Sequence, residues 1–391
     1  MKRLTHSGQG KSAHFGFLKL LAISTLFIYF LFPTMSIAQT AMPGNGVNKK
    51  SGITTFDIPG AGSGAHQGTV ANCINNKGTI TGVYFDAGSV AHGFVRASDG
   101  TIATFDVPGA GTGKFEGTKP VFVTSTGTVI GFSEDANVVY HGFVRTADGA
   151  ITTFDAPGAG TNRGQGTGFA YMNAKGIAVG WYVDENEVYH GFLLSATGSF
   201  STFDAPEAGT GNVQGTTPYW IAGNLVTGYY IDSNYLIHGF VRSGKGVITS
   251  FDAPGGGTGQ FQGTTGEAIN TKGVITGLVT DNNYANHGFV RSADGTITLF
   301  DPPNSGDGDY QGTSPYAINA KGDIAGYYVD SNNVNHGFLR DLDGTITPID
   351  VPQAGTGYGE GTQALTINSK GDIAGCYIDA NFANHGFLLI P

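Results

Sequence analysis

The sequence predicts an all-β protein: a seven-bladed β-propeller with four-stranded antiparallel blades. Three observations predict this fold. A Thr-rich run ending in Phe-Asp or Ile-Asp occurs seven times, with its Asp at intervals of 49, 49, 49, 48, 49 and 49 residues. A His-Gly-Phe motif also occurs seven times, at intervals of 48 or 49 residues. Gly supplies 64 of the 391 residues and only 13% are charged, which is typical of turn-rich β-structure rather than of long solvated helices.

The strands of one repeat can be read from residues 311–350. Asn319–Gly322 indicates a hairpin turn whose Gly suits a left-handed backbone, and Asp343-Gly344 indicates a second hairpin. Between them, Asp330–Asn333 is typical of a turn closed by the Asp side chain. Four strands are therefore expected, at 312–319, 323–329, 336–340 and 345–350, followed by a connector rich in Pro and Gly.

The ends of the repeat array indicate a closed ring. The array opens at 53–57 with a lone fourth strand and closes at 385–390 with a third strand that has no fourth strand after it. Pairing the N-terminal strand with the last blade would complete that blade and hide sheet edges. Six repeats of 49 residues and one of 48 fill residues 50–391. An open β-solenoid is the alternative.

The N-terminal segment differs from the repeats. Residues 1–19 carry four basic groups and no acidic group, a 13-residue apolar run follows at 20–32, and small residues precede a cleavage point after Ala38. This pattern predicts a signal peptide over 1–38, with a short leader at 39–49, and a secreted, extracellular or periplasmic protein. Cleavage would leave 16 basic and 30 acidic residues, a net charge of −14. This negative charge would repel nucleic acid and anionic lipid, so we expect no nucleic-acid partner and no membrane insertion after cleavage. We also expect a monomer.

The repeats resemble a known family. The run Ala-Ile-Asn-x-Lys-Gly-Asp-Ile-Ala-Gly-Tyr-Tyr, followed by His-Gly-Phe-Leu and Gly-Thr-Ile, is similar to the extracellular HAF repeats. The resemblance covers residues 50–391. This chain differs in having His-Gly-Phe where those repeats have His-Ala-Phe, and in its Phe-Asp-x-Pro-Gly-Ala-Gly connector. The resemblance implies an exported bacterial protein of repeated β-units, and it implies no activity and no functional residue.

The repeat histidines are expected to be structural. Seven equivalent side chains, one per blade, do not form the single asymmetric site that catalysis needs, and they do not converge on one metal ion. A hydrogen bond within each blade, to a turn or to a repeat Asp, is the predicted role. The residues are His92, His141, His190, His238, His287, His336 and His385.

Two further repeated motifs predict no cofactor. The Asp-x-Asn turn spaces oxygen ligands as calcium requires, but it lacks the additional carboxylates of a calcium loop, so a turn closed by Asp is favoured over a structural calcium site. The Pro-Gly-Ala-Gly-Thr-Gly connector resembles a phosphate-binding loop only superficially, because a strand follows it and no Gly-Lys-Ser/Thr ending is present. No metal site and no catalytic residue are predicted.

Residues that differ between the repeats are the candidate binding site, because loops on a fixed scaffold commonly carry function. They lie in the connectors or at the start of the strand that follows each connector. Aromatic and polar side chains in such a place could stack on a glycan or contact a protein. They are His66, Phe115, Lys119, Arg163, Trp220, Phe261, Glu267, Tyr310, Tyr316 and Tyr358.

Three functions fit these patterns. A non-enzymatic scaffold that binds a glycan or a protein at the variable loop face is the leading prediction. A secreted polysaccharide lyase or hydrolase with its site at the channel mouth is the first alternative, although no nucleophile elbow, zinc motif or clear carboxylate pair is present. A purely structural surface or matrix protein is the other.

The two cysteines lie in the first and last complete blades, which would be neighbours across the ring seam. An exported chain permits a disulfide between Cys73 and Cys376, which would strengthen the closure. Stacked sheets lie about 10 Å apart, however, and a disulfide needs its Cα atoms within about 7 Å. Two buried free thiols are therefore the alternative.

Overall fold

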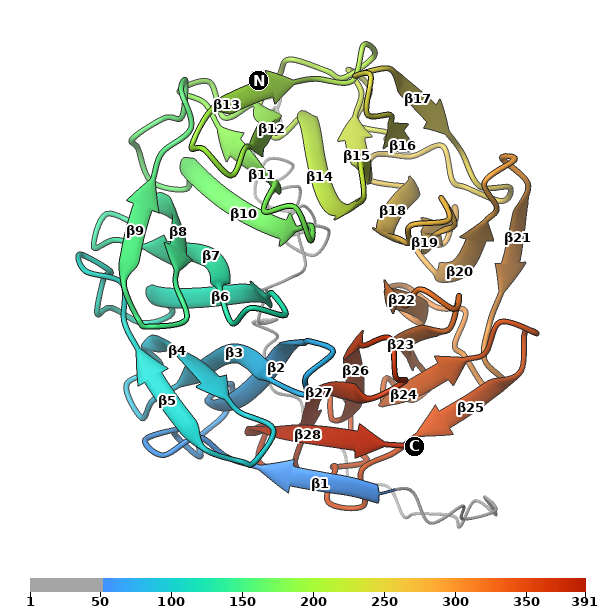
Figure 1. Cartoon of the computed structure of the whole chain (residues 1–391). Helices are drawn as coiled ribbons and strands as arrows, with labels where there is room; N and C mark the ends of the chain where they lie inside the picture. The colour runs from blue at the N-terminus through green and yellow to red at the C-terminus, as the bar shows by residue number, and fades with distance from the viewer. Residues whose placement is uncertain (1–51) are drawn as a thin grey trace, which may run out of the picture. The chain divides into compact units, whose positions relative to one another are not determined.

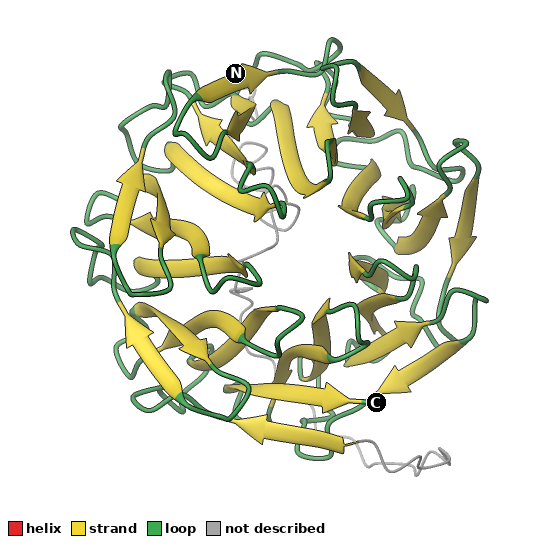
Figure 2. Cartoon of the chain, in the orientation of Figure 1, coloured by secondary structure: helices red, strands yellow, loops and turns green. Residues whose placement is uncertain are grey.

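The computed structural model of the chain describes residues 52–391, which contain 28 strands and no helix (Figures 1 and 2). The predicted signal peptide and leader lie outside these residues. The strands form a closed propeller-like ring of antiparallel four-stranded units, and 28 strands would fit seven such units. No helix in the described part of the chain is long and apolar enough to cross a membrane.

The innermost and second strands of each unit form a hairpin, with the innermost strands nearest the centre of the ring (Figure 1). We name each unit after its innermost strand. The innermost strands are β2 (Gly68–Ile74), β6 (Gly117–Val123), β10 (Gly166–Met172), β14 (Gly215–Ala222), β18 (Gly263–Ile269), β22 (Gly312–Ile318) and β26 (Gly361–Ile367). The second strands are β3 (Ile80–Phe85), β7 (Val129–Glu134), β11 (Ala178–Val183), β15 (Leu225–Ile231), β19 (Ile275–Thr280), β23 (Ile324–Val329) and β27 (Ile373–Ile378).

The third and outer strands complete each unit. The third strands are β4 (Ala91–Arg96), β8 (Tyr140–Arg145), β12 (Tyr189–Leu194), β16 (Ile237–Arg242), β20 (Asn286–Arg291), β24 (Asn335–Arg340) and β28 (Asn384–Ile390). The outer strands are β1 (Gly52–Phe56), β5 (Ile102–Phe105), β9 (Ile151–Phe154), β13 (Phe200–Phe203), β17 (Ile248–Phe251), β21 (Ile297–Phe300) and β25 (Ile346–Ile349). In the β22 unit the four strands agree with the predicted ones to within two residues.

The ring has two faces. The connectors between units and the turns that join second to third strands lie at one end of the strands, and we call this end the connector face. The turns that join innermost to second strands, and third to outer strands, lie at the other end, the hairpin face. This separation follows from the antiparallel order of the strands.

The core lies between neighbouring sheets. The Phe of each His-Gly-Phe motif is fully buried, as Phe94 in β4 illustrates. A Cβ atom on Gly82 would lie 3.0 Å from the Phe94 ring and 2.0 Å from a backbone oxygen, and one on Gly93 would lie 2.7 Å from the Phe105 ring. Two of the glycines that recur in every repeat are therefore required by close packing, as interiors at crystal-like density demand.

The ring closes through the first and last strands of the described chain. Strand β1 pairs antiparallel with β28 over five residue pairs, from Gly52 with Ile390 to Phe56 with Gly386. The amide of His66 also donates to the Phe382 carbonyl, and the Asn368 side chain donates to the Asn75 carbonyl across the same seam. The predicted closure is confirmed, and an open solenoid is excluded by these contacts.

Candidate functional site

Each repeat His lies between two Asp side chains on the connector face. In the β2 unit, Nδ1 of His92 is 2.9 Å from Asp106 and Nε2 is 3.6 Å from Asp86. Because a carboxylate only accepts hydrogen bonds, Nδ1 carries the hydrogen and donates a hydrogen bond to Asp106. Asp106 begins the connector and Asp86 begins the preceding turn, so one imidazole holds two loops together.

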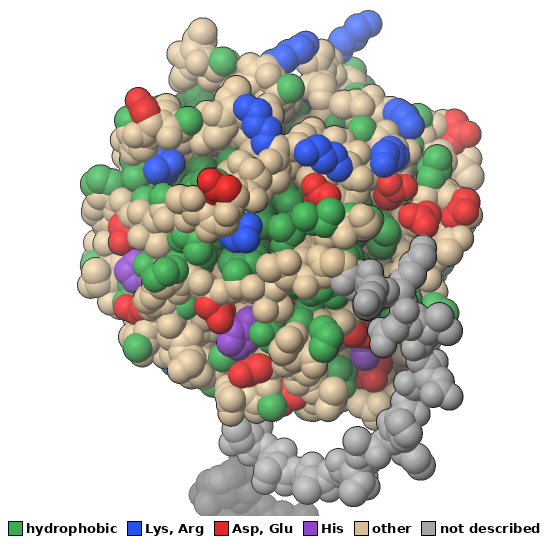
Figure 3. All heavy atoms as spheres, turned by 60° about the horizontal axis from the view of Figure 1, so that its bottom comes forward, with side chains coloured by type: hydrophobic (Ala, Val, Ile, Leu, Met, Phe, Trp, Pro, Cys, Tyr) green, Lys and Arg blue, Asp and Glu red, His purple; other side chains and the backbone are tan. Residues whose placement is uncertain are grey.

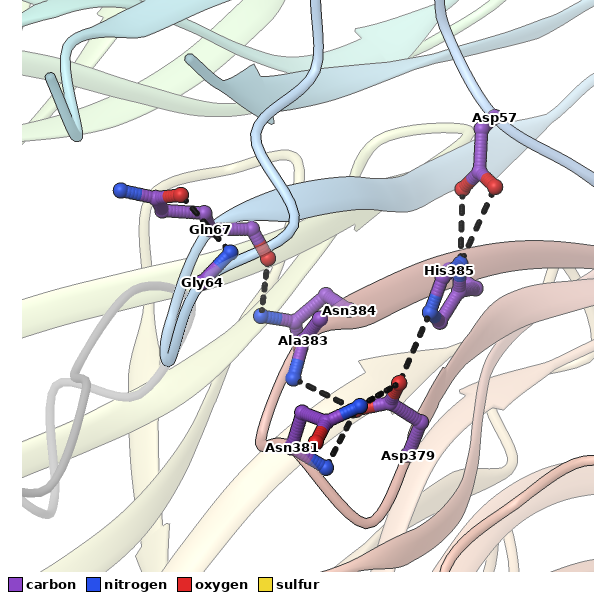
Figure 4. Close-up of polar contacts among 8 residues, drawn as sticks. All are labelled: Asp57, Gly64, Gln67, Asp379, Asn381, Ala383, Asn384 and His385. Carbon is purple, nitrogen blue, oxygen red and sulfur yellow. Dashed lines mark hydrogen bonds and ion pairs between the residues drawn. The ribbon is translucent and has the colours of Figure 1, made fainter. Parts of the chain in front are cut away.

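The same arrangement recurs at the seam with partners from the two ends of the chain (Figure 4). His385 donates through Nδ1 to Asp57 at 3.0 Å, and its Nε2 lies 3.6 Å from Asp379. Asp379 also accepts hydrogen bonds from the backbone amides of Asn381 and Ala383. His385 therefore connects a connector that begins at residue 57 with a turn more than 320 residues later.

Hydrogen bonds to Asp raise the pKa of five of the repeat histidines. For His336, the hydrogen bond to Asp350 is the main cause, and the charges of Asp350 and Asp330 add to it against the opposing effect of burial. The same direction and leading cause apply to His190, His238, His287 and His385. Protonation of these five histidines strengthens their hydrogen bonds to Asp, so the stability that the clusters contribute depends on pH.

The Asp-x-Asn turns are closed by their own side chains. The Asp135 carboxylate accepts from the amides of Asn137 and Val139 at 2.8 and 2.9 Å, as a turn closed by Asp requires. Within residues 52–391, no group of three or more His, Cys, Asp or Glu side chains is arranged to hold a metal ion.

Four of the predicted connector residues adopt a left-handed backbone. His66, Phe115, Phe261 and Tyr310 have φ between 60° and 66°, a conformation that costs a bulky side chain roughly 1–2 kcal/mol. Gly164 takes the same role in another connector. Bulky residues are thus present where Gly would be less strained.

Aromatic contacts between units offset that strain. Phe261 lies 5.4 Å, centroid to centroid, from Tyr235 in the turn of the preceding unit, and Tyr310 lies 6.2 Å from Tyr284. Each connector residue also donates its backbone amide to the carbonyl of the same turn residue. These aromatic side chains therefore fasten connectors to turns, and Phe261 is buried.

Other predicted connector residues differ in exposure. Arg163 is exposed, and Tyr358 keeps 56% of its surface exposed. Burial, and next the charge of Lys114, lowers the pKa of His66. Among the predicted connector residues that the structure describes, Arg163 and Tyr358 are the exposed ones.

Lys119 is buried beside β7 rather than exposed at the mouth of the ring. Its Nζ forms a short contact with the Glu134 carboxylate, and both side chains are almost wholly buried. A buried charge without a partner is costly, so this pair is required once either residue is present. The sequence alone does not reveal that Lys119 has a partner 15 residues later.

Trp220 belongs to a stack between units. Its ring stacks on Tyr171 with centroids 3.7 Å apart, and Tyr171 in turn contacts Phe122 at 3.9 Å. The Trp220 side chain also packs against the core of the β18 and β22 units. Its main role is packing, with contacts that extend from Tyr171 in β10 to the core clusters of the β18, β22 and β26 units.

Three neighbouring innermost strands, which lie nearest the centre of the ring, carry Tyr219, Glu267 and Tyr316 at equivalent positions. Each is the extra residue of a β-bulge. In β14 the register shifts between Pro218 and Trp220, and β18 and β22 shift at the equivalent points. A bulge leaves its extra residue unpaired and redirects the side chain. All three stay partly exposed in strands that are otherwise mostly buried. We call them the axial cluster.

A second layer of phenols supports the axial cluster. Tyr229 hydrogen-bonds to Tyr219 and Thr217, and its ring lies 5.4 Å from that of Tyr219. Tyr327 hydrogen-bonds to Tyr316, with the two rings stacked at 5.5 Å. Burial raises the pKa of Tyr219, Tyr229 and Tyr327, so these phenols keep their protons. The cluster is rigid, aromatic and rich in hydroxyl groups.

Glu267 lies between these tyrosines in an environment that disfavours its charge. Burial raises its pKa to about 8, and no neighbouring charge contributes to the shift. At pH 7 the carboxyl group is therefore mostly neutral and can both donate and accept a hydrogen bond. A neutral carboxyl group among phenols is suited to polar, uncharged ligands.

The axial cluster was predicted only in part. Glu267 and Tyr316 are on the predicted list, whereas Tyr219 is missing from it and its neighbour Trp220 stands there instead. The bulge decides which of two successive residues is left unpaired. The signal that could have found Tyr219 is alignment with Glu267 and Tyr316 at the same position of the repeat.

Cys73 and Cys376 are buried free thiols, so the disulfide considered for the seam is absent from the structure. Cys73 packs with Val107, Val123 and Phe143 of the next unit. Cys376 donates to the Gln363 side chain within its own unit. Burial raises the pKa of both thiols to about 12, which makes them unreactive at neutral pH.

Comparisons with known proteins show similarity in fold. No protein-family model matches the chain, and the curated proteins contain no match to it. Among solved structures, a streptogramin B lyase is similar at 16% identity and a TM-score of 0.55, covering 87% of this chain and 98% of its own. The BP39L lectin of Burkholderia pseudomallei is similar at 9% identity and a TM-score of 0.54, covering 82% of this chain and 94% of its own. At these identities the similarity shows a shared β-propeller fold, carried by one structure named a lyase and another named a lectin.

Proposed function

We propose that this chain is an exported, non-enzymatic seven-bladed β-propeller that binds a neutral glycan at the axial cluster. One observation carries the proposal: Tyr219, Glu267 and Tyr316 stand at the same bulge position of three adjacent strands, where the other four repeats have neither an aromatic nor an acidic residue. A scaffold of identical units needs no such residues for folding. Export rests on the N-terminal sequence pattern and on the resemblance to extracellular HAF repeats.

The chemistry of the axial cluster supports a sugar ligand. Aromatic rings stack on the apolar faces of sugars, and phenol and carboxyl groups hydrogen-bond to sugar hydroxyls. The neutral state of Glu267 avoids placing an unpaired charge against an uncharged ligand. The lectin of similar fold supports the proposal only in showing that such a ring can serve a glycan-binding protein.

A glycan array followed by calorimetry tests this proposal. Tyr316→Ala and Tyr219→Ala should each weaken binding of the best neutral oligosaccharide by roughly tenfold, the usual loss for a central aromatic contact. Tyr358→Ala, at the exposed tyrosine of the connector face, is the matched variant and should leave the affinity unchanged. Loss with Tyr358→Ala alone would move the site to the connector face, and no binding at all would contradict the proposal.

A secreted lyase or hydrolase is the second candidate, and Glu267 favours it. A carboxyl group with a pKa of about 8 can act as a general acid near neutral pH. Incubation with a panel of polysaccharides tests this function. Turnover that Glu267→Gln abolishes, while ligand binding persists, would replace the binding proposal with the enzymatic one.

A further inference from the structure

The two faces of the ring differ in charge. Every unit places the two Asp residues of its His cluster on the connector face, as Asp86 and Asp106 illustrate. The hairpin face carries most of the lysines and arginines. In Figure 3 the Lys and Arg side chains gather toward the top of the view and the His side chains lie below them. The negative net charge of the chain therefore does not describe the hairpin face.

Four lysines lie on adjacent turns of the hairpin face. They occupy the same position of the turns that follow β18, β22, β26 and β2, so the row crosses the ring seam. All four are exposed, and the ion pairs of residues 52–391 do not involve them. We call Lys272, Lys321, Lys370 and Lys77 the lysine row.

The turn itself does not require Lys. Thr126 occupies the same position in the turn after β6, with the same backbone hydrogen bond from Gly127 to residue 124 as Gly78 makes to residue 75. A fold that accepts Thr here leaves the lysines free to serve a partner.

Hydrogen bonds between neighbouring turns hold the lysine row in place. The side chain of Asn270 donates to the Asn319 carbonyl, Asn319 to Asn368, and Asn368 to Asn75. The Lys272 ammonium group reaches the Lys321 carbonyl at 3.4 Å, so adjacent turns are within the span of one side chain. Charges on fixed backbones lose little freedom when a ligand binds.

Two acidic residues share these turns without pairing with the lysines. The carboxylates of Asp323 and Asp372 accept hydrogen bonds from Asn319 and Asn368 at 2.9 and 2.8 Å. They reduce the positive charge of the row, but these bonds hold the two carboxylates against the Asn side chains of their own turns.

Arginines lie on the same face, each with an aspartate in the turn that follows: Asp343 near Arg340 and Asp294 near Arg291. The Arg340 guanidinium lies 4.9 Å from the centre of the Phe300 ring, and Arg291 lies at the same distance from Phe251. The Nε atoms of both arginines are buried without a hydrogen-bond partner. Stacking fixes these charges near the third strands, outside the lysine row.

The acidic connector face does not cancel this charge. The strands that separate the faces have six or seven residues, which corresponds to about 20 Å. The Debye length at physiological salt is about 8 Å. A ligand on the hairpin face therefore experiences mainly the local charges, which are the lysine row with Asp323 and Asp372, and arginines that Asp294 and Asp343 partly neutralise.

We infer that the hairpin face binds a linear anionic polysaccharide, carboxylated or sulfated, along the lysine row. The exposed Asn76, Thr271 and Ser369 beside the lysines supply amide and hydroxyl groups for sugar hydroxyls. Single-stranded nucleic acids bind through aromatic stacking, and membranes through inserted apolar side chains. The turns of the lysine row carry no aromatic residue, so a polysaccharide fits them better than either.

The experiment measures binding of the purified protein to polygalacturonate and to dextran sulfate, with neutral dextran as the uncharged reference. The test variant is Lys272→Thr with Lys321→Thr and Lys370→Thr, because Thr is native to this turn at position 126. The control variant is Ser63→Glu with Lys114→Thr and Gln353→Glu, which changes the net charge equally but on the connector face. Circular dichroism and thermal melting check that both variants fold.

The test variant should lose at least about tenfold in affinity for one of the two polyanions. The slope of log affinity against log salt should become shallower by about 2, because fewer counterions are released. The control variant should bind like the parent chain. Unchanged binding by the test variant, an equal loss in the control, or tighter lysine-dependent binding to duplex DNA or phosphatidylglycerol vesicles would each overturn the inference. Binding to neutral oligosaccharides belongs to the axial cluster and is unaffected by the outcome.

Discussion

The His clusters and the axial cluster are two polar regions of one ring, and they differ in how they relate to the repeat. The cluster around His92 recurs with the same atoms and nearly the same distances in every unit, including the seam. The axial cluster occurs at only three of the equivalent bulges. A polar group repeated in every unit serves what every unit must do, which is to join its loops.

The two regions also differ in what they do to stability. The carboxylates around five of the histidines, His336 among them, favour the protonated form and stabilise the fold, whereas the surroundings of Glu267 disfavour its charged form. Functional groups commonly cost stability, because their surroundings suit a ligand rather than the free protein. Removal of a residue should therefore destabilise the first region and stabilise the second.

The largest effect is expected from removal of the strand that completes the ring. Deletion of residues 1–57 removes β1, the partly buried Ile53 and Phe56, and the Asp57 partner of His385. The lost apolar burial and hydrogen bonds amount to roughly 8 kcal/mol, or about 10 °C in melting temperature for a chain of this size. Differential scanning calorimetry measures the shift. Deletion of residues 1–50 is the matched control, and equal melting of both truncated chains would refute closure through β1.

Replacement of Glu267 should have a smaller effect of opposite sign. Its pKa is about 8 in the folded protein and 4.5 in the reference state, so the unfolded state binds fewer protons between these values. Folding stability therefore falls as the pH rises from 4.5 toward 8, by as much as roughly 4 kcal/mol, and stays at the lower value above pH 8. Glu267→Gln keeps the shape of the neutral acid and removes this loss.

Thermal melting of the parent and Glu267→Gln at pH 5, 7 and 9 checks this expectation. The variant should melt higher by about 5 °C at pH 9 and equally at pH 5. Lower stability of the variant at every pH would mean that the carboxyl group serves the fold, as the histidines do.

The period of the sequence predicted most of the fold because each repeat contains its own turn signals. Gly322 and Gly344 end hairpins where expected, and both have a positive φ. The closing pair of β1 and β28 was also predictable, since it follows from the unmatched strands at the two ends. Local conformational rules and strand pairing are properties that a single repeat already carries.

The site was less predictable, because it depends on where side chains point after the strands associate. The bulge leaves Tyr219 unpaired, whereas Trp220, the residue expected at the site, pairs with Thr227 and packs into core clusters. Lys119 looked like an exposed cation, yet the hairpin register buries it beside Glu134. The connector aromatics looked like a binding surface, yet residues such as Phe261 contact turns of the preceding unit. None of these contacts follows from composition or spacing.

The smallest effect is expected from substitution of single histidines, and it compares the seam with the interior of the ring. His336 and His385 both lie 3.0 Å from their Asp partner, but the partner of His336 is 14 residues away and that of His385 is 328 residues away. His336→Gln and His385→Gln should each lower the free energy of unfolding by about 1–2 kcal/mol, the contribution of one charge-assisted hydrogen bond.

The pH dependence distinguishes this contribution from simple packing. Because the folded pKa of both histidines is raised, their stabilisation is fully present below the unfolded value of 6.5 and is lost as the pH rises through the folded pKa. Chemical denaturation at pH 6 and pH 9 should therefore show the larger loss at pH 6 for both variants. If the ring unfolds as one unit, the two losses are equal, because equilibrium stability does not depend on how far apart the partners lie in sequence. A clearly larger loss or a separate early transition in His385→Gln would mean that the seam opens on its own, so that the β1–β28 closure is the weakest junction of the ring.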